Sequence, residues 1–322
     1  MKLKITKKDK KYLSYISGTL LGDGCIIHQH GRKPRFQFIH TSTDYQWCKF
    51  CYEQLRLFIP LYPPVYRKIK DERVTKGYTE SYMVQSRTSD IISNLDVIWY
   101  PDGKKIVPID FLYEFLDERT LAWWYMDDGH LKVENGLPRK IIISTDNFET
   151  VENQKLIELL YKKFSIKFSL DGQNRLVLYD SLQLHYFHQL VKPLMHPSMK
   201  RKMINVNQVS NRKLPKRTSI YLPEEISILK PTSDINNQLN YLPYLYEKFR
   251  SRDTYLYFYK NYLIQLKEIK NTKSYQISIH PKHWDMLIKI NKLTGLNISQ
   301  IVSLCFLLNM HNNTNRTIKT NK

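Results

Sequence analysis

The sequence predicts an α+β protein in which the order helix–strand–strand–helix–strand–strand–helix occurs twice before a mainly helical C-terminal extension. Apolar helical runs at 16–24 and 121–129 each end in an acidic residue followed by glycine. Short segments with period-two alternation follow each run, as strands of antiparallel sheets do. A basic, proline-containing segment at 211–217 then sets off the extension. We therefore expect half-domains at 1–117 and 118–205 and a basic extension at 206–322.

In the first half-domain, a helix over 7–21 is predicted because Leu13, Ile16 and Leu20 recur at helical spacing. An amphipathic helix over 44–58 follows from the same kind of spacing. The other predicted elements are strands at 25–28, 35–40, 65–70 and 78–85 and a short helix at 89–95.

The second half-domain repeats this order, beginning with a helix over 120–128. Asn135 and Gly136 form a dipeptide that favours a tight hairpin turn. The predicted elements are strands at 131–133, 140–144, 166–170 and 175–179 and helices at 149–164 and 182–190.

The composition indicates a polyanionic partner. The 322 residues carry a formal net charge of +20, which favours nucleic acid over a neutral ligand. A membrane-surface protein is the rival interpretation, but the sequence has no apolar run of membrane-spanning length and no secretory signal. Four scattered cysteines form no disulfide or zinc pattern. We expect an intracellular protein, in a bacterial cytoplasm or in an organelle such as a mitochondrion or chloroplast.

The two acidic helix ends predict a metal site. Gly18 and Gly22 stand one helical turn apart, where missing side chains let a second backbone approach. If the two helices pack side by side, Asp23 and Asp128 meet at their ends, with the following glycines allowing a left-handed exit. Paired carboxylates suit Mg²⁺ and phosphodiester hydrolysis.

At Ile16–Gly24 and Leu121–Gly129 the chain resembles the LAGLIDADG homing endonuclease family in its single-chain form with two motifs. Segments 99–108, 143–148 and 192–199 resemble further parts of that family. The resemblance implies two pseudo-symmetric αββαββα half-domains whose antiparallel sheets form a saddle. It also implies a monomer that makes staggered double-strand cuts in a DNA target with Mg²⁺ (or Mn²⁺), as in intron homing.

The resemblance also assigns candidate site residues. The metal-binding candidates are Asp23 and Asp128 and the residues directly before them, Gly22 and Asp127. Trp123 and Asp127 of the second motif stand where the first has glycines, so the packing cannot be symmetric, and alignment of the motifs favours Asp128 as the ligand. His40 and Arg87 fall near the family's water-organising and basic positions and complete the catalytic candidates.

Polar residues on or beside the predicted strands are candidates for DNA contact, because antiparallel ribbons fit the major groove. The alternative is that they form an ordinary solvated sheet face. The set is Arg35, Gln37, Arg67, Lys68, Lys70, Arg139, Lys140 and Arg175.

Two other functions stay open on the same fold. An RNA-splicing maturase would bind its own intron RNA and need no intact acid pair. A non-catalytic DNA-binding regulator would be expected to have lost the acids, and here both are present.

The extension carries 18 Lys and Arg against 7 Asp and Glu from residue 206 onward. A strand at 274–279, a helix at 281–293, Gly295 and a helix over 299–310 resemble a ribbon-helix-helix DNA-binding module, with a plain helical hairpin as the alternative. The aromatic segment 241–262 is predicted as core helix, and residues after about 311 as disordered.

Overall fold

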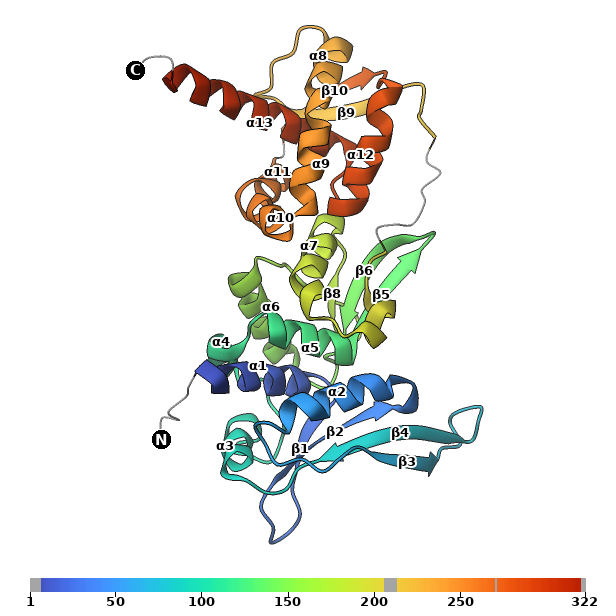
Figure 1. Cartoon of the computed structure of the whole chain (residues 1–322), viewed down its shortest axis with the longest axis vertical. Coiled ribbons are helices and arrows are strands. Elements are labelled where there is room, and N and C mark those ends of the chain that lie inside the picture. The colour runs from blue at the N-terminus through green and yellow to red at the C-terminus, as the bar shows by residue number, and fades with distance from the viewer. Residues whose placement is uncertain (1–6, 206–212, 270, 320–322) are drawn as a thin grey trace. The chain divides into compact units, whose positions relative to one another are not determined.

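The computed structural model describes residues 7–205, 213–269 and 271–319 (Figure 1). The chain folds as two compact units, one formed by residues 1–179 and 190–203, the other by 180–189 and 204–322. Residues 180–189 therefore group with the C-terminal unit, whereas the sequence assigned them to the second half-domain. Among the described residues, no helix is both long and apolar enough to cross a membrane.

The first half of the N-terminal unit has the predicted αββαββα order. Its four strands form an antiparallel sheet in the order β1-β2-β4-β3. The elements are α1 (Lys7–Leu21), β1 (Gly24–Ile27), β2 (Arg35–Thr41), the 3₁₀ turn η1 (Ser42–Asp44), α2 (Tyr45–Leu55), β3 (Val65–Lys70), β4 (Tyr78–Gln85) and α3 (Asp90–Trp99).

The second half repeats the order, with a sheet arranged β5-β6-β8-β7. One short helix, α4 (Ile109–Phe115), was not predicted and lies between the halves in sequence. The other elements are α5 (Glu118–Asp128), β5 (Gly129–Glu134), β6 (Leu137–Ile143), α6 (Thr150–Phe164), β7 (Ser169–Leu170), β8 (Leu176–Leu178), α7 (Ser181–Val191) and the 3₁₀ segments η2 (Lys192–Leu194) and η3 (Pro197–Lys202). The predicted α+β class is confirmed.

Helices α1 and α5 pack against each other along the two motifs (Figure 1). A β-carbon placed on Gly18 would lie 2.7 Å from Cβ of Trp123 and 2.8 Å from the carbonyl oxygen of Thr120. A β-carbon on Gly22 would lie 2.6 Å from Cβ of Asp127. The predicted close approach is therefore confirmed, and it pairs each glycine with a large or charged residue of the other helix.

The predicted left-handed exit after the motifs is wrong. Gly129 has φ −79° and ψ 146°, and Gly24 is not among the residues with positive φ. Both glycines instead begin a strand where a β-carbon would strike the preceding helix, at the carbonyl oxygen of Thr19 for Gly24 and at Tyr125 for Gly129. Close packing, not backbone handedness, excludes side chains there.

The C-terminal unit surrounds a two-stranded sheet that the sequence predicted only in part. The strand β10 (Thr272–Ile277) was expected nearby, but its partner β9 (Thr218–Pro223) was not. The segment predicted as one helix over 241–262 is divided into short helices. The remaining elements are α8 (Pro231–Gln238), η4 (Leu239–Tyr241), α9 (Leu242–Arg250), α10 (Arg252–Phe258), the π-helical turn η5 (Tyr259–Leu263), α11 (Ile264–Glu268), α12 (Pro281–Thr294) and α13 (Ile298–Lys319).

Helix α13 runs past the predicted end at Met310, because neither glycine nor proline interrupts residues 298–319. Gly295 ends α12 with φ 75°, the left-handed conformation that glycine adopts without strain. In the same unit, the rings of Tyr186 on α7 and Tyr259 stack with centroids 3.5 Å apart. The first part of α7 is thus built into the core of the C-terminal unit.

Candidate functional site

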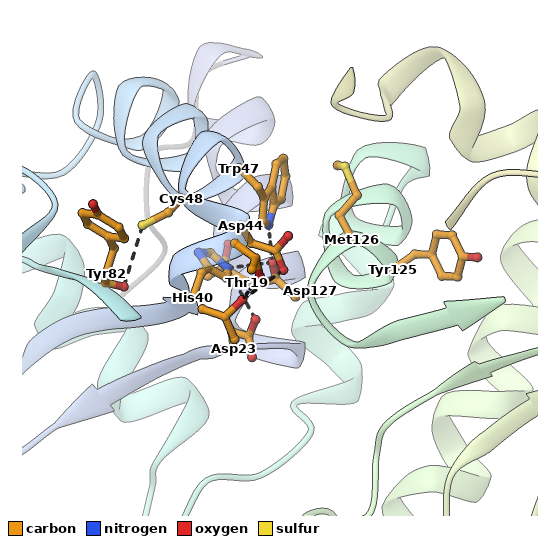
Figure 2. A network of polar contacts seen from close by, with 12 residues as sticks. Thr19, Asp23, His40, Asp44, Trp47, Cys48, Tyr82, Tyr125, Met126 and Asp127 are labelled. Carbon is orange, nitrogen blue, oxygen red and sulfur yellow. Dashed lines mark hydrogen bonds and ion pairs between the residues drawn. The ribbon is translucent and has the colours of Figure 1, made fainter. Parts of the chain in front are cut away.

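Three residues from separate elements meet where α1 and α5 end (Figure 2). Asp23 follows α1, His40 lies near the end of β2, and Asp127 is in the last turn of α5. His40 Nε2 is 3.1 Å from Asp127 Oδ1 and 3.4 Å from Asp23 Oδ2. One ligand atom from each of the three lies within 4.8 Å of the others. The histidine therefore bridges two carboxylates that come from opposite halves of the repeat.

The side chain of Asp127 is fully buried and held from two sides. Trp47 Nε1 donates a hydrogen bond of 2.7 Å to Asp127 Oδ1, the same oxygen that faces His40 (Figure 2). Its second oxygen, Oδ2, is buried without a hydrogen-bond partner among the described residues. A buried carboxylate oxygen without a donor is costly, so this atom has capacity for a further ligand.

Asp23 and Asp128 both have raised pKa values. Burial and the charge of Asp127 raise the pKa of Asp23 to about 6, against the opposing charges of His40 and Lys202. Burial raises the pKa of Asp128 to about 8, with smaller contributions from the charges of Asp23 and Asp127. The three carboxylates thus repel one another, and a bound cation would relieve that repulsion.

His40 is buried and carries a positive charge. Burial opposes that charge, but the hydrogen bond with Asp127 and the charges of Asp127 and Asp23 outweigh it and raise the pKa of His40 to about 10. With 3% of its side chain exposed, it can act on a substrate only through the carboxylates that it orients.

Two lysines that the sequence interpretation missed also lie at this site. Lys105 Nζ donates a hydrogen bond of 2.8 Å to the carbonyl oxygen of Gly24, and its charge lowers the pKa of Asp128. Lys202 Nζ donates a hydrogen bond of 2.9 Å to the carbonyl oxygen of Asp127, at the negative end of the α5 dipole. Burial lowers the pKa of both lysines.

A signal for these lysines existed in the sequence. Lys105 lies inside the segment 99–108 that carries part of the family resemblance, and Lys202 comes three residues after the segment 192–199. Each half of the repeat thus supplies one lysine.

The oxygen atoms of the cluster are of the type that Mg²⁺ prefers. Asp23, Asp127 and Asp128 could hold a divalent cation, and the unpartnered Oδ2 of Asp127 fits such a role. Gly22 contributes no side chain to the site. A β-carbon at this position would lie 2.9 Å from Asp127 Oδ2, so the glycine leaves room for that carboxylate. The choice between Asp127 and Asp128 stays a prediction.

Arg87 lies apart from the carboxylates. It follows β4, its side chain is exposed, and its guanidinium carbon lies 5.1 Å from the centre of the Tyr62 ring. No hydrogen bond or ion pair joins it to Asp23, Asp127 or Asp128 within the described parts of the chain. Its proposed catalytic role therefore gains no support from this geometry.

The predicted DNA-contact residues of the first sheet are divided between its two faces. Along β2, Arg35 and Gln37 alternate with the buried Phe36 and Phe38 and so project from the face away from the core. Strand pairing through β4 places Arg67 of β3 on the same outer face. Strand pairing places Lys68 opposite Glu80 and Lys70 opposite Tyr78, on the other face. Lys68 and Lys70 therefore lie on the opposite face of the sheet from Arg35, Gln37 and Arg67, because adjacent strand residues point in opposite directions.

Of the three predicted DNA-contact residues in or beside the second sheet, only Lys140 has a regular paired position on the outer face. It pairs with Lys132, a basic residue that the sequence interpretation omitted. Arg139 is the extra residue of a bulge, where the pairing shifts between Lys132 and Val133, and it lies 3.5 Å from Glu134. Arg175 precedes β8 and forms an ion pair of 2.7 Å with Asp171, so its charge is already engaged.

Comparisons with known proteins agree with this architecture. The model of the LAGLIDADG DNA endonuclease family matches residues 13–181. An uncharacterised protein of Methanocaldococcus jannaschii is 31% identical over 196 residues, which cover 59% of this chain and 72% of that protein. The cytochrome b mRNA maturase bI2 of Debaryomyces hansenii is 29% identical over 211 residues, covering 61% of this chain and 75% of the maturase.

A solved structure shares the fold. The homing endonuclease I-WcaI bound to its DNA recognition sequence aligns with a TM-score of 0.53 and 23% identity, covering 62% of this chain and 88% of that one. The family match spans both motifs and both sheets. The chain therefore belongs to the LAGLIDADG DNA endonuclease family.

Proposed function

We propose that this protein is a site-specific endonuclease that hydrolyses both strands of a DNA target with the help of a divalent metal ion. The observation that carries the proposal is the cluster of Asp23, His40 and Asp127, whose ligand atoms lie within 4.8 Å of one another. The charges of Asp23 and Asp127 also act on Asp128 and help to raise its pKa. Repelling acids at the end of two packed helices destabilise the metal-free fold, and such arrangements persist mainly at functional sites.

Asp23 and Asp128 would hold the metal, with Asp127 as an additional ligand or as the group that orients Asp23 through His40. A divalent cation at such a site activates water and stabilises negative charge on a phosphate. Among the chain's own groups, His40 Nε2 fixes the positions of Asp23 and Asp127. The ammonium groups of Lys105 and Lys202 supply positive charge that can stabilise a phosphate bound beside the acids.

Substrate binding would use the outer faces of the two sheets. Arg35, Gln37 and Arg67 of the first sheet and Lys132 and Lys140 of the second project from these faces. The net charge of +20 favours a polyanion, and the solved relative I-WcaI is bound to its DNA recognition sequence.

A second candidate function is that of an RNA-splicing maturase, which the similarity to the Debaryomyces hansenii maturase favours. This activity needs RNA binding but no acid cluster. A dual role would therefore predict splicing that survives the loss of Asp23 or Asp128.

The proposal is tested by selecting cleaved products from a random-sequence duplex library with Mg²⁺, and with EDTA as the control. We expect one enriched target family, cut only with the metal. Binding should weaken steeply with salt, with a slope in log K of roughly −0.9 per phosphate contacted. No cleavage of any duplex, or a flat salt response, would contradict the proposal. Intracellular localisation stays a prediction.

A further inference from the structure

Three apolar side chains lie in register across the outer face of the first sheet. Strand pairing places Ile39 of β2 opposite Met83 of β4, and Met83 opposite Val65 of β3. Directly opposed residues of antiparallel strands project from the same face. Ile39 lies two residues after Gln37, on the face away from the core. The three side chains therefore form one continuous strip, which we call the apolar row.

The apolar row is accessible to a ligand. Ile39 is 36% exposed and Val65 is 54% exposed. Met83 is half-buried, with Arg67 Nη1 lying 3.2 Å from its sulfur atom. The core of this half lies behind the other face of the sheet, so the row contributes little to it. A single exposed apolar residue is ordinary, but three adjacent ones on neighbouring strands form a contact surface.

Polar rows flank the apolar row on both sides. On one side Gln37 pairs with Gln85, and Gln85 Nε2 donates a hydrogen bond of 3.5 Å to Gln37 Oε1. On the other side Ser81 pairs with both Thr41 and Arg67. Neighbouring rows are about 6.6 Å apart along a strand, close to two base-pair steps of about 3.4 Å each. Each row would therefore face a different base pair of a duplex laid along the sheet.

The apolar row lies at the level of the carboxylate cluster. Ile39 directly precedes His40, whose Nε2 is 3.4 Å from Asp23 Oδ2. Gly24, which follows Asp23, pairs with Phe38 on the same strand as Ile39. A base pair in contact with the row would therefore lie near the phosphates on which the acids would act.

We propose that the apolar row contacts the 5-methyl group of a pyrimidine in the DNA target, so that thymine is selected at this position. The inference rests on the proposed function, because it takes the outer sheet face as the DNA-binding surface. In the major groove, thymine presents a methyl group and a carbonyl oxygen, whereas cytosine presents an amino group. The aliphatic side chains of the row can bury the methyl group but cannot accept a hydrogen bond from the amino group. 5-Methylcytosine carries the same methyl group and should bind better here than cytosine.

The test is a deoxyuridine scan of a duplex that the full-length protein selects from a random library in EDTA. Each thymine of the bound site is replaced in turn by uracil, which removes only the methyl group. We expect at least one thymine whose replacement weakens binding about fourfold, the equivalent of one methyl group returned to water. EDTA prevents metal-dependent cleavage, so the scan measures binding alone.

A double variant assigns the sensitive thymine to the apolar row. Ile39→Thr/Val65→Thr keeps both residues β-branched and places a hydroxyl beside the base. The control is Val133→Thr/Val151→Thr, at two exposed valines outside the row. The effect of uracil at the sensitive position should fall below about twofold in the row variant and stay about fourfold in the control. Each effect is a ratio of two affinities measured on one protein preparation, so a partial loss of folded protein cancels.

A second comparison places cytosine or 5-methylcytosine at the sensitive position. The parent protein should bind the methylated base about fourfold more tightly, and the row variant should not distinguish the two. An effect of uracil that is equal in the parent and the row variant at every thymine would overturn the proposal, and the row would then serve only to pair the strands.

Cleavage with Mg²⁺ is scored separately on the same duplex. A protein that binds with row-dependent selection of thymine but does not cut would contradict the nuclease proposal and support this inference. A protein that cuts but shows no row-dependent selection of thymine would do the reverse. Failure to select any duplex would overturn both.

Discussion

His40 and Asp127 form a buried ion pair, with 3.1 Å between Nε2 and Oδ1 and with 3% and 0% of their side chains exposed. The residue that corresponds to Asp127 in the first motif is Gly22, which has no side chain. The pair therefore joins the two halves in one direction only, from His40 of the first half to Asp127 of the second, and it makes the carboxylate cluster asymmetric.

The three acids should respond differently to neutral substitution. Asp23→Asn and Asp128→Asn should abolish cleavage while DNA binding survives, because each removes a candidate metal ligand. Asp127→Asn should be milder for cleavage but should destabilise the fold by about 3–5 kcal/mol, since it breaks a buried ion pair. Cleavage assays, binding titrations and thermal melts of the three variants check this. If Asp127→Asn alone abolishes cleavage in a folded protein, Asp127 rather than Asp128 is the ligand.

Metal-free protein should lose stability as the pH rises from about 4 to 8. The pKa values of Asp23 and Asp128 are raised from 3.8 to about 6 and about 8 in the folded state. The folded protein therefore binds more protons than the unfolded chain in this range, so the free energy of unfolding falls with pH. His40, whose pKa is raised from 6.5 to about 10, acts in the same direction above its unfolded value.

Thermal melts in EDTA across this range measure the effect. The fall should be smaller in Asp128→Asn, which cannot ionise, and Mg²⁺ should reduce it in the parent protein. A melting temperature that falls equally in the parent and in Asp128→Asn would argue against a strained carboxylate at position 128.

Trp47→Phe should lower stability by about 1.5–3 kcal/mol beyond the loss of ring volume, because it removes a hydrogen bond to a charged carboxylate. Trp124→Phe is the matched control, since Trp124 is fully buried but its Nε1 has no hydrogen-bond partner in the described structure. Chemical unfolding of both variants gives the comparison. Equal losses would mean that the hydrogen bond to Asp127 contributes little.

Gly18→Ala should destabilise the protein by about 1–3 kcal/mol through overpacking, although alanine normally favours a helix. The added methyl group would meet Trp123 Cβ at 2.7 Å. Gly172→Ala is the control, because nothing lies within 4 Å of its β-carbon position. Urea unfolding distinguishes them, and a neutral Gly18→Ala would show that α1 and α5 can separate without cost.

One chain should bind each DNA target. Both motifs lie in one polypeptide, and β10 finds its partner strand in the same chain. Sedimentation of the protein–DNA complex should therefore give a stoichiometry of one. Two chains per target would contradict a monomeric nuclease.

The repeated element order is determined by the sequence itself. Local spacing of apolar residues predicts α1 at the bounds that the structure shows, because this helix buries one face. The strands β3 and β4 also have their predicted bounds, although no residue of β3 is buried. The Asn135–Gly136 turn, with φ of 50° and 72°, is likewise a local property. The acidic residues at the ends of the two motif helices can also be identified from the sequence, by comparing one motif with the other.

Tertiary structure alone decided which groups meet at the site. His40 and Asp127 are 87 residues apart, and only the packing of α1 against α5 brings them together. Strand β9 has too short a pattern to be identified by itself, and pairing with β10 about fifty positions later makes it a strand. The opposite orientations of Arg67 and Lys68 follow from strand register. Contacts over such separations depend on the whole packed core, which local patterns do not encode.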